Sequence, residues 1–288
     1  MPEAITFKEQ VASGERFEFG KNWQSFLSVL DDDRIREAER SLREMLGVEN
    51  LDGRRLLDVG CGSGLFSLAA QRLGAAHVHS FDFDPQSVAC AQSLHRTYVP
   101  QATNWTIERG SVLDQEYLRR LGQWDIVYSW GVLHHTGAMW QALANVEPLV
   151  APGGLLFIAI YNDQGLPTRW WKRVKRLYNA GPLGKAVVCS VYFPYFGGTG
   201  LAADVIKGRN PLARYREYRR VRGMSKMHDW FDWLGGLPFE VAKPEQIFDF
   251  YRGRGFEMIK LKTCAGGLGC NEFVFQRLTE NARHQHEP

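Results

Sequence analysis

The sequence has little that would direct it to a membrane or to an oxidising compartment. Its five cysteines are scattered and include no Cys-x-x-Cys pair, which disfavours a disulfide framework and a zinc site. The first residues show neither the basic segment nor the apolar core of a secretion signal. The longest apolar run, Ala186–Phe196, is about half of the roughly 20 residues that a membrane-spanning helix needs. We therefore expect a soluble, cytoplasmic protein.

Repeats, low-complexity tracts and clusters of metal-ligating side chains are also lacking, so no metal is expected. The formal net charge is only +3 over 288 residues, which is too small to indicate nucleic acid as a partner. Hydrophobic residues make up 44% of the chain, enough for a sizeable core. His284 and His286 belong to a polar tail and receive no expected role.

Short apolar runs alternate with helical patterns in the middle of the chain, and this rhythm returns near its end. It is typical of an α/β fold with a doubly wound, mostly parallel sheet that has helices on both faces. The predicted strands are Arg55–Val59, His77–Phe81, Trp105–Glu108, Trp124–Ser129, Leu155–Tyr161, Phe256–Thr263 and Asn271–Gln276. The predicted helices are Asp31–Gly47, Leu65–Leu73, Pro85–Thr97, Ala138–Leu149 and Pro244–Arg254. Glycines between the last two strands indicate a hairpin, which would make the final strand antiparallel.

Four parts follow from this pattern. Residues 1–50 are expected to form an N-terminal helical extension or cap, and residues 51–162 with 243–277 form the α/β core. Residues 163–242 form a helical insertion after strand five, and residues 278–288 form the polar tail. The insertion is basic and aromatic, with thirteen Lys or Arg against Asp204 and Glu217 between Arg169 and Arg222.

The basic insertion has three interpretations. It could be a lid whose aromatic side chains enclose a substrate while its cations meet a phosphate or carboxylate. It could be an interface for an anionic membrane surface, a peptide or nucleic acid. The cluster Arg214–Arg220 could also be only the solvated face of a helix.

A glycine-rich turn follows the first predicted strand and opens a helix. It reads Asp58-x-Gly60-x-Gly62-x-Gly64. Glycines allow the backbone to turn tightly and approach a ligand, and the helix start offers unpaired N–H groups. The spacing differs from the Gly-x-Gly-x-x-Gly of dinucleotide sites, where a pyrophosphate is bound. A tight turn without a ligand is the alternative.

Polar side chains also end the next two strands. Asp82 ends strand two, where a carboxylate can accept hydrogen bonds from both ribose hydroxyls of an adenosine group. Asp84 competes for this role, but Asp84-Pro85 has the pattern of a helix start. Ser111 and Val112 follow strand three and are expected at an adenine, because ligands lie at the carboxyl ends of strands in such sheets.

These motifs together resemble class I S-adenosylmethionine-dependent methyltransferases, and among them the ubiquinone-type and other small-molecule methylases. The resemblance rests on the glycine turn, Asp82, the run from Trp124 to His135 and Val150–Ala159, and covers roughly residues 50–162. It implies a seven-stranded sheet with a reversed last strand, and S-adenosylmethionine as cofactor with S-adenosylhomocysteine as product. It also implies that Asp58, Gly60, Gly62 and Gly64 hold the methionine moiety and Asp82 the ribose. One departure is that the Asn/Asp-Pro-Pro-aromatic motif of base and amide methylases is replaced by Ser129–Val132.

Further contacts with the methyl donor are expected from three aromatic residues. Phe83 follows Asp82, Trp130 ends strand four, and Trp23 lies in an N-terminal segment that could fold over the donor. An aromatic face favours the positive charge of a sulfonium. Trp23 as an ordinary core residue is the alternative.

Methyl transfer needs alignment of donor and acceptor, and a base only where the acceptor must lose a proton. His134 and His135 follow strand four, and Tyr161 ends strand five. His228, next to Asp229, lies in the insertion. Since neighbouring side chains usually diverge, at most one of His134 and His135 is expected to face the acceptor, and purely structural roles remain open.

The sequence thus predicts a methyltransferase for a small or medium-sized acceptor, with an O, N or C target atom, that serves in the biosynthesis of a metabolite. Its alternatives are methylation of a peptide or protein side chain, an NAD-dependent oxidoreductase, and a non-enzymatic module that binds the donor. Nucleic acid is not the expected partner, and peripheral contact with a membrane stays open.

Overall fold

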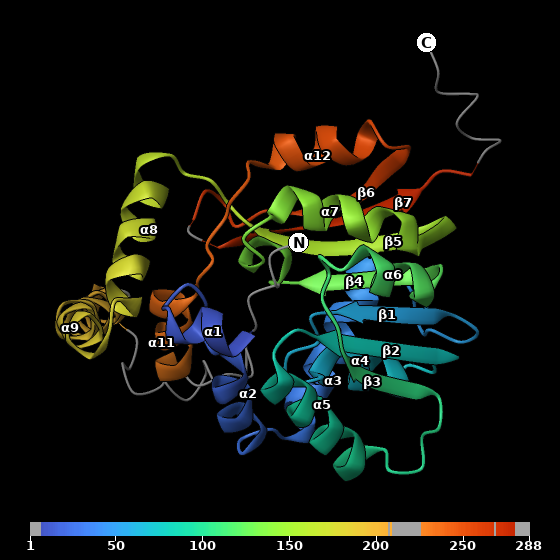
Figure 1. Ribbon diagram of the computed structural model, residues 1–288, viewed down its shortest axis with the longest axis horizontal. Coiled ribbons are helices and arrows are strands. Elements are labelled where there is room, and N and C mark those ends of the chain that lie inside the picture. Colours follow the sequence, from blue (N-terminus) through green and yellow to red (C-terminus); the bar gives the residue numbers. More distant parts are fainter. Residues whose placement is uncertain (1–6, 207, 209–225, 268, 280–288) are drawn as a thin grey trace.

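A computed structural model describes residues 7–206, 208, 226–267 and 269–279 (Figure 1). The chain forms a seven-stranded sheet in the order β3-β2-β1-β4-β5-β7-β6. Strands β1 to β5 run parallel to one another, and β7 pairs antiparallel with both β5 and β6. The predicted fold class, with its reversed last strand, is confirmed. The cluster Arg214–Arg220, His284 and His286 lie outside the described residues.

The strands lie close to their predicted positions. They are β1 (Arg55–Val59), β2 (His77–Asp82), β3 (Trp105–Arg109), β4 (Trp124–Trp130), β5 (Val150–Tyr161), β6 (Phe256–Lys262) and β7 (Cys270–Arg277). Successive side chains of a strand point to opposite faces, so Leu56 and Leu57 of β1 belong to different hydrophobic cores.

Helices cover both faces of the sheet. One core includes α3 (Asp32–Leu46), α4 (Leu65–Arg72) and α5 (Pro85–Tyr98). The other includes α6 (Gln115–Leu121), α7 (Met139–Val146) and α12 (Pro244–Arg252). The carboxyl ends of the parallel strands are therefore left uncovered by these two layers.

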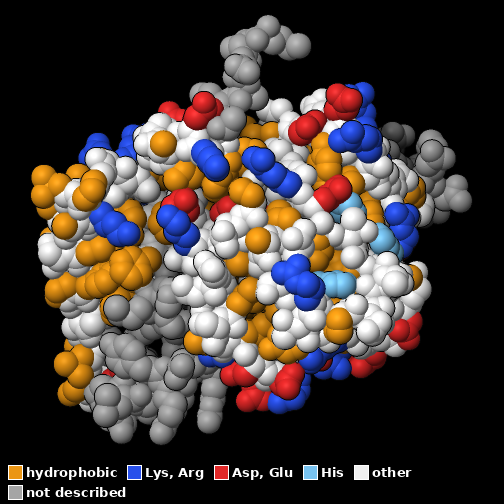
Figure 2. Space-filling model, turned by 60° about the horizontal axis from the view of Figure 1, so that its bottom comes forward, with side chains coloured by type: hydrophobic (Ala, Val, Ile, Leu, Met, Phe, Trp, Pro, Cys, Tyr) orange, Lys and Arg blue, Asp and Glu red, His pale blue; other side chains and the backbone are white. Residues whose placement is uncertain are grey.

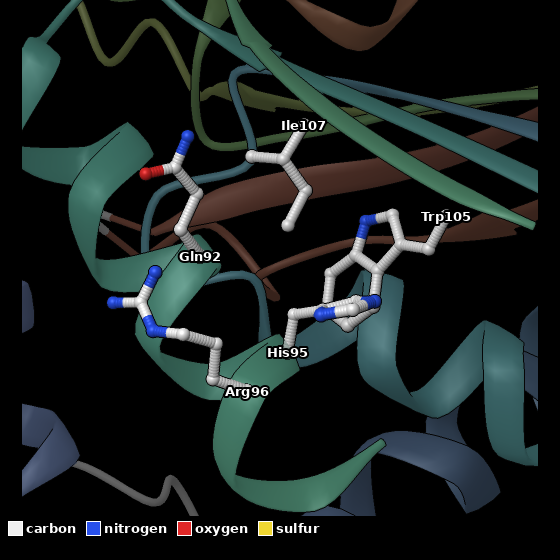
Figure 3. A pocket seen from close by; sticks show the side chains of 5 residues that line it. All are labelled: Gln92, His95, Arg96, Trp105 and Ile107. Carbon is white, nitrogen blue, oxygen red and sulfur yellow. The ribbon is translucent and has the colours of Figure 1, made fainter. Parts of the chain in front are cut away.

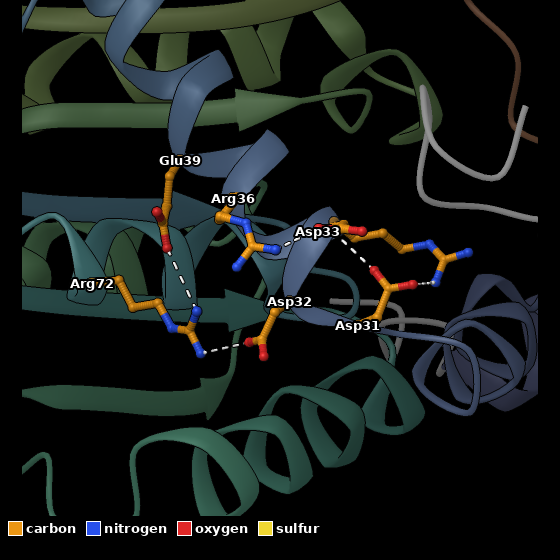
Figure 4. Close-up of polar contacts among 7 residues, drawn as sticks. Asp31, Asp32, Asp33, Arg36, Glu39 and Arg72 are labelled. Atoms are coloured by element: carbon orange, nitrogen blue, oxygen red, sulfur yellow. Dashed lines mark hydrogen bonds and ion pairs between the residues drawn. The ribbon is translucent and has the colours of Figure 1, made fainter. Parts of the chain in front are cut away.

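Helix α3 shows how local sequence fixes an element. Asp31 accepts a hydrogen bond from the Arg34 N–H at 3.0 Å and begins the helix, and Gly47 ends it at φ +67°. Arg72 of α4 forms ion pairs with Asp32 at 3.3 Å and Glu39 at 3.8 Å (Figure 4). The helix predicted at residues 31–47 is thus confirmed, and it packs on α4 as part of the core.

Strand β5 begins five residues before its predicted start. Ala151–Gly154 interrupts the register, since Trp124 pairs with Val150 while Ile126 pairs with Leu155. Pro152 and the two glycines resemble a turn in the sequence, but here they form a bulge within the strand. Helix α6 was not predicted, and the helix predicted at residues 138–149 ends at Val146 in a 3₁₀ turn, Glu147–Leu149.

In the part of the chain that the structure describes, five further α-helices lie beyond the sheet on one side (Figure 1). They are α1 (Phe7–Ala12), α2 (Phe19–Leu27), α8 (Leu166–Asn179), α9 (Pro182–Ile206) and α11 (Lys226–Gly235). A third hydrophobic cluster joins α8, α9 and α11 to Phe17 of the N-terminal segment. The insertion thus has a small core of its own.

Helix α9 corrects one expectation. The apolar run in the sequence is too short to span a membrane, but α9 has 25 residues, and by length and composition it is the one described helix that could do so. The helix continues past Pro194, although proline removes one N–H donor and its ring crowds the carbonyl of Ser190.

Candidate functional site

The glycine turn is closely enclosed. Gly60, Gly62 and Gly64 have φ values of +79°, +55° and +82°, which strongly favour glycine. A Cβ at Gly60 would lie 2.3 Å from the side chain of Val132, after β4, and one at Gly62 would lie 2.9 Å from the Trp23 ring. A Cβ at Gly64 would lie 2.8 Å from α5. The turn is therefore packed by the segment after β4, by α2 and by α5.

Asp82 joins the turns that follow β1 and β2. One carboxylate oxygen accepts the Gly62 N–H at 2.9 Å, and the other accepts the Asp84 N–H at 2.9 Å. Burial raises the pKa of Asp82 to about 6, although these two hydrogen bonds act in the opposite direction. The structure thus places a buried carboxylate directly against the glycine turn.

Asp84 has a different function in the structure. Its carboxylate accepts the Gln86 N–H at 2.9 Å and begins α5, as its sequence pattern predicted. Its other oxygen accepts the Gly20 N–H at 2.8 Å, which fastens α2 to the start of α5. Asp84 therefore holds the N-terminal segment, and Asp82 alone faces the turn.

Asp58 points to the body of the fold. It accepts a hydrogen bond from the Ser67 hydroxyl of α4, and Ser67 in turn lies 2.7 Å from the Ser80 hydroxyl. Burial raises the pKa of Asp58 to about 7. Its described hydrogen bond joins β1 to α4 beneath the glycine turn.

Phe83, expected as a contact of the donor, follows β2, and Ser111 and Val112, expected at the adenine, follow β3. The guanidinium groups of Arg16 and Arg109 lie 5.1 and 5.7 Å from the centre of the Phe83 ring. The Ser111 hydroxyl accepts the Leu113 N–H at 3.2 Å. The Val112 side chain is buried in the core on the α6 and α7 face of the sheet, so it contributes packing there.

Arg16 closes the site from the N-terminal side. Its guanidinium donates to the carbonyl of His135 at 3.1 Å and that of Thr136 at 3.4 Å. Burial lowers the pKa of Arg16, while the charges of Asp82 and Asp84 act against this shift. Arg16 was not predicted, because apart from Gln10 its partners lie 66 to 120 positions away and no local pattern marks it.

His134, His135 and Tyr161 lie together, as predicted from their strand ends. The His134 ring is 4.5 Å from the His135 ring and 4.2 Å from the Tyr161 ring, between centroids. His134 is fully buried with no hydrogen bond to either ring nitrogen in the described part of the chain. Burial and the nearby His135 and Lys175 lower the pKa of His134 well below its usual value.

His135 has a defined tautomer. Its Nδ1 lies 2.6 Å from the Pro238 carbonyl oxygen, and since a carbonyl can only accept, Nδ1 carries the proton. Burial lowers the pKa of His135 to about 3, so the ring is neutral at physiological pH. Its Nε2 therefore has a lone pair and can accept a proton or a hydrogen bond.

A small cavity of about 10 Å³, with room for no more than a water molecule, lies beside Tyr161. Helices α8 and α11 form its wall with the segment before α12, and its lining is Tyr161, Asn162, Trp171, Lys175, Trp233 and Phe239. The Lys175 ammonium donates to the Trp233 carbonyl and lies 4.8 Å from the centre of the Phe239 ring. In the sequence, Lys175 is one of many basic residues of the insertion, and no local pattern indicates that it is buried.

The two remaining candidates are less closely tied to this cavity. Trp130 ends β4 and is 41% exposed. His228 lies in α11, and its side chain is outside the described part of the structure. In the described ranges no group of three His, Cys, Asp or Glu could hold a metal ion.

A second hollow lies at the opposite edge of the sheet, between α5 and β3. Figure 3 shows its lining, Gln92, His95, Arg96, Trp105 and Ile107. Trp105 donates to Ser80 at 2.8 Å and His95 lies 3.0 Å from the Ala102 carbonyl, so both have structural partners. This hollow is separate from the glycine turn and His135.

Comparison with known proteins agrees with this geometry. Residues 57–156 match a family described as a methyltransferase domain. This core belongs to the class I S-adenosylmethionine-dependent methyltransferases. The methyltransferase core contains the glycine turn, Asp82 and His135, whereas Arg16 and Lys175 lie outside the matched residues.

Two curated relatives are similar over parts of the chain. A ubiquinone biosynthesis O-methyltransferase of Rhizobium etli is 30% identical over 129 residues, which are 45% of this chain and 50% of the relative. A ribosomal protein L11 methyltransferase of Xanthomonas oryzae pv. oryzae is 45% identical over 60 residues, 18% of this chain and 19% of the relative. The chain thus spans half or less of these relatives' length.

A solved structure has the same fold over most of both chains. Magnesium protoporphyrin IX methyltransferase of Synechocystis PCC 6803, with bound S-adenosylhomocysteine, superposes with a TM-score of 0.52 at 15% identity. The match covers 89% of this chain and 93% of that chain. At this identity the likeness extends to the fold alone.

Proposed function

We propose that this chain binds S-adenosylmethionine at the glycine turn and transfers its methyl group to a small or medium-sized acceptor. The observation that carries the proposal is the pairing of Asp82 with the Gly62 N–H at 2.9 Å, at the carboxyl ends of two parallel strands. The N–H groups of a turn with three glycines and a buried carboxylate offer both donors and acceptors to an adenosine with an amino-acid tail. These residues therefore fit the methyl donor.

Each residue has a place in this proposal. Gly60, Gly62 and Gly64 would hold the methionine moiety, and Asp82 the ribose hydroxyls. Phe83, Ser111 and Val112 follow β2 and β3 on the adenine side. Trp23 lies on Gly62, where its ring would face the donor's positive charge. Asp58 would support the glycine turn indirectly, because its hydrogen bond to Ser67 joins β1 to α4 beneath the turn.

The bound donor supplies a methyl carbon that its sulfonium already activates. The protein's contribution is to align the acceptor with this carbon and to exclude water. Arg16 closes the N-terminal segment over the site, and Tyr161 with the rings of His134 and His135 forms an apolar wall beside the cavity. These contacts support a site shielded from solvent.

The histidines restrict the chemistry of the acceptor. With a pKa of about 3, His135 is too weak a base to deprotonate an alcohol before transfer. Its unprotonated Nε2 could instead accept a hydrogen bond from an O–H or N–H of the acceptor and so orient it. The half-buried Arg16 and the buried Lys175 nearby favour an anionic acceptor.

The similarity of the core to a ubiquinone biosynthesis O-methyltransferase supports a small acceptor over a folded protein. Methylation of a peptide or protein side chain is the second candidate. The exposed cations of α8, which would attract an acidic peptide, favour it.

A radiolabelled methyl-transfer assay tests the proposal. Lysate fractions of small molecules, peptides, proteins, lipids and RNA are incubated with labelled S-adenosylmethionine and the protein. We expect label in the small-molecule fraction, lost with Asp82→Ala and kept with Asp125→Ala at the far end of β4. Label in peptides or proteins instead supports the second candidate, and no label in any fraction contradicts a transferase.

A further inference from the structure

Helix α9 presents an unusual surface. Leu183, Val187, Val191, Leu201 and Val205 recur at spacings that place them on one side of the helix, and each is 46–79% exposed. The only charged residues in α9 are Lys185 and Asp204, and Asp204 is buried. At about 1.5 Å per residue this uncharged stripe extends over roughly 30 Å.

The opposite side of α9 already has partners. Val188 is buried, and Tyr192 and Phe196 pack on the Trp171 ring of α8. The exposed apolar stripe is therefore not the side that stabilises the insertion. A soluble surface rarely exposes so continuous an apolar area without a partner.

Helix α8 adds cations beside further exposed apolar side chains. Leu166, Trp170 and Leu177 are 47–75% exposed, and their spacing places them on one face of α8. Next to them are four exposed cations that form no ion pair within the described ranges: Arg169, Lys172, Arg173 and Arg176. The Trp170 indole donates to the Tyr192 hydroxyl at 2.9 Å, which joins this face to α9.

Figure 2 shows the result on the surface. Apolar side chains gather along the left margin, where α8 and α9 lie in Figure 1, and Lys and Arg side chains lie beside them. We call the exposed side chains of α8 and α9 named above the α8–α9 face. It combines an apolar stripe, a tryptophan and a row of cations.

We propose that the α8–α9 face binds the surface of an anionic phospholipid bilayer. A bilayer surface offers acyl chains to the apolar stripe and phosphates to the cations within a few ångströms of each other, and Trp170 suits the boundary between them. A second copy of this chain would instead bring the two rows of cations together. Since one side of α9 is packed on the protein, the helix would lie along the surface.

Vesicle co-sedimentation tests this inference, which is independent of methyl transfer. The full chain is mixed with vesicles of phosphatidylcholine alone, or with vesicles of phosphatidylcholine that contain about 30% phosphatidylglycerol, which makes their surface anionic. We expect binding to the anionic vesicles that falls at least about tenfold between low and high salt. We expect little binding to the neutral vesicles.

Two variants with matched controls localise the contact. Val187→Glu with Val191→Glu, and separately Arg169→Glu with Arg173→Glu, should each weaken binding at least about tenfold. Ile259→Glu on β6, also an exposed apolar position, and Arg36→Glu with Arg40→Glu on α3 should bind as the unchanged protein does. Unchanged calorimetric affinity for S-adenosylhomocysteine, or an unchanged circular dichroism melt, shows that each variant is folded.

Three results would overturn the proposal. One is the absence of binding to anionic vesicles. Another is binding that neither pair of variants changes. The third is a dimer in sedimentation velocity that Val187→Glu with Val191→Glu dissociates while no vesicle is bound, which would assign the face to a second copy.

Discussion

Gly62 shows how a single position can carry both backbone strain and a close contact. Its φ of +55° disfavours any other residue, and a Cβ would lie 2.9 Å from the Trp23 ring. Such contacts transmit a change at one atom to the segment that covers the turn. The proposed donor site therefore depends on α2 as well as on the turn itself.

A pair of glycine variants separates these two effects. Gly62→Ala should displace Trp23 and lower the affinity for S-adenosylhomocysteine at least about tenfold, or about 1.4 kcal/mol, in a calorimetric titration. Gly47→Ala, at φ +67° with open space around it, should lower the free energy of unfolding by about 1 kcal/mol and leave that affinity unchanged. Equal effects of the two variants on affinity would show that Trp23 has no part in the site.

Asp58 should make stability depend on pH. Burial raises its pKa from 3.8 to about 7, so the folded protein binds this proton more tightly than the unfolded chain does. The stabilisation is fully present below about pH 4 and is lost as the pH rises through 7. Asp58→Asn cannot titrate, and relative to the unchanged protein it should gain roughly 2–3 kcal/mol between pH 5 and 8 in urea unfolding. A constant difference across this range would contradict the raised pKa.

The sequence located some site residues and not others for a physical reason. Gly62, Asp82 and His135 end strands of one parallel sheet, and the topology brings such ends together whatever their surroundings. Arg16 comes from the loop between α1 and α2, and Lys175 comes from α8, both outside that sheet. Their burial depends on how the N-terminal segment and the insertion pack, and no local pattern of residues records this.

At the scale of elements, the same contrast appears. Buried parallel strands leave strong apolar runs, so β1 begins and ends at its predicted residues. The bulge at Ala151–Gly154 concealed the start of β5, because Pro and Gly also mark turns. Helix α9 was underestimated because Pro194 and its small neighbours interrupt the pattern without ending the helix.

The N-terminal segment with α1 and α2 should loosen when Arg16 is removed. Arg16→Ala loses both hydrogen bonds to the segment after β4 and leaves Asp82 and Asp84 without a nearby cation. We expect faster amide hydrogen exchange in α1 and α2, with β1 and β2 unchanged. Arg36→Ala on α3, which loses only an exposed ion pair with Asp33, is the control. Unchanged exchange in α1 and α2 would mean that Asp84 and Gly20 suffice to hold them.

At the scale of the whole molecule, the described residues form three separate hydrophobic cores. Two lie on the faces of the sheet, and the third joins α8, α9 and α11 to Phe17. The third core and the methyltransferase core both line the cavity beside Tyr161, and the segment before α12 joins the end of β5 through a bridge between Asn162 and Ala242. We therefore expect the insertion to lose stability without a matching loss in the sheet.

Trp171→Ala tests this division. The substitution removes the ring that contacts Tyr192, Phe196 and Trp233. Replacing a buried tryptophan by alanine typically lowers the free energy of unfolding by about 3–5 kcal/mol. We expect increased hydrogen exchange in α8 and α11 and little change in β1, β4 and β5. Leu177→Ala, at an exposed position of α8, should change neither. An equal rise in exchange across the sheet would show that the insertion and the sheet unfold as one unit.

The central claim is that the glycine turn and Asp82 bind S-adenosylmethionine. Calorimetric titration of the protein with S-adenosylmethionine, S-adenosylhomocysteine and NAD tests it most directly, with Asp82→Ala and Asp125→Ala as paired variants. We predict that both sulfur compounds bind more tightly than NAD, and that Asp82→Ala weakens their binding by roughly 1–3 kcal/mol while Asp125→Ala does not. Tighter binding of NAD, or equal affinity in the Asp82→Ala variant, would contradict the claim.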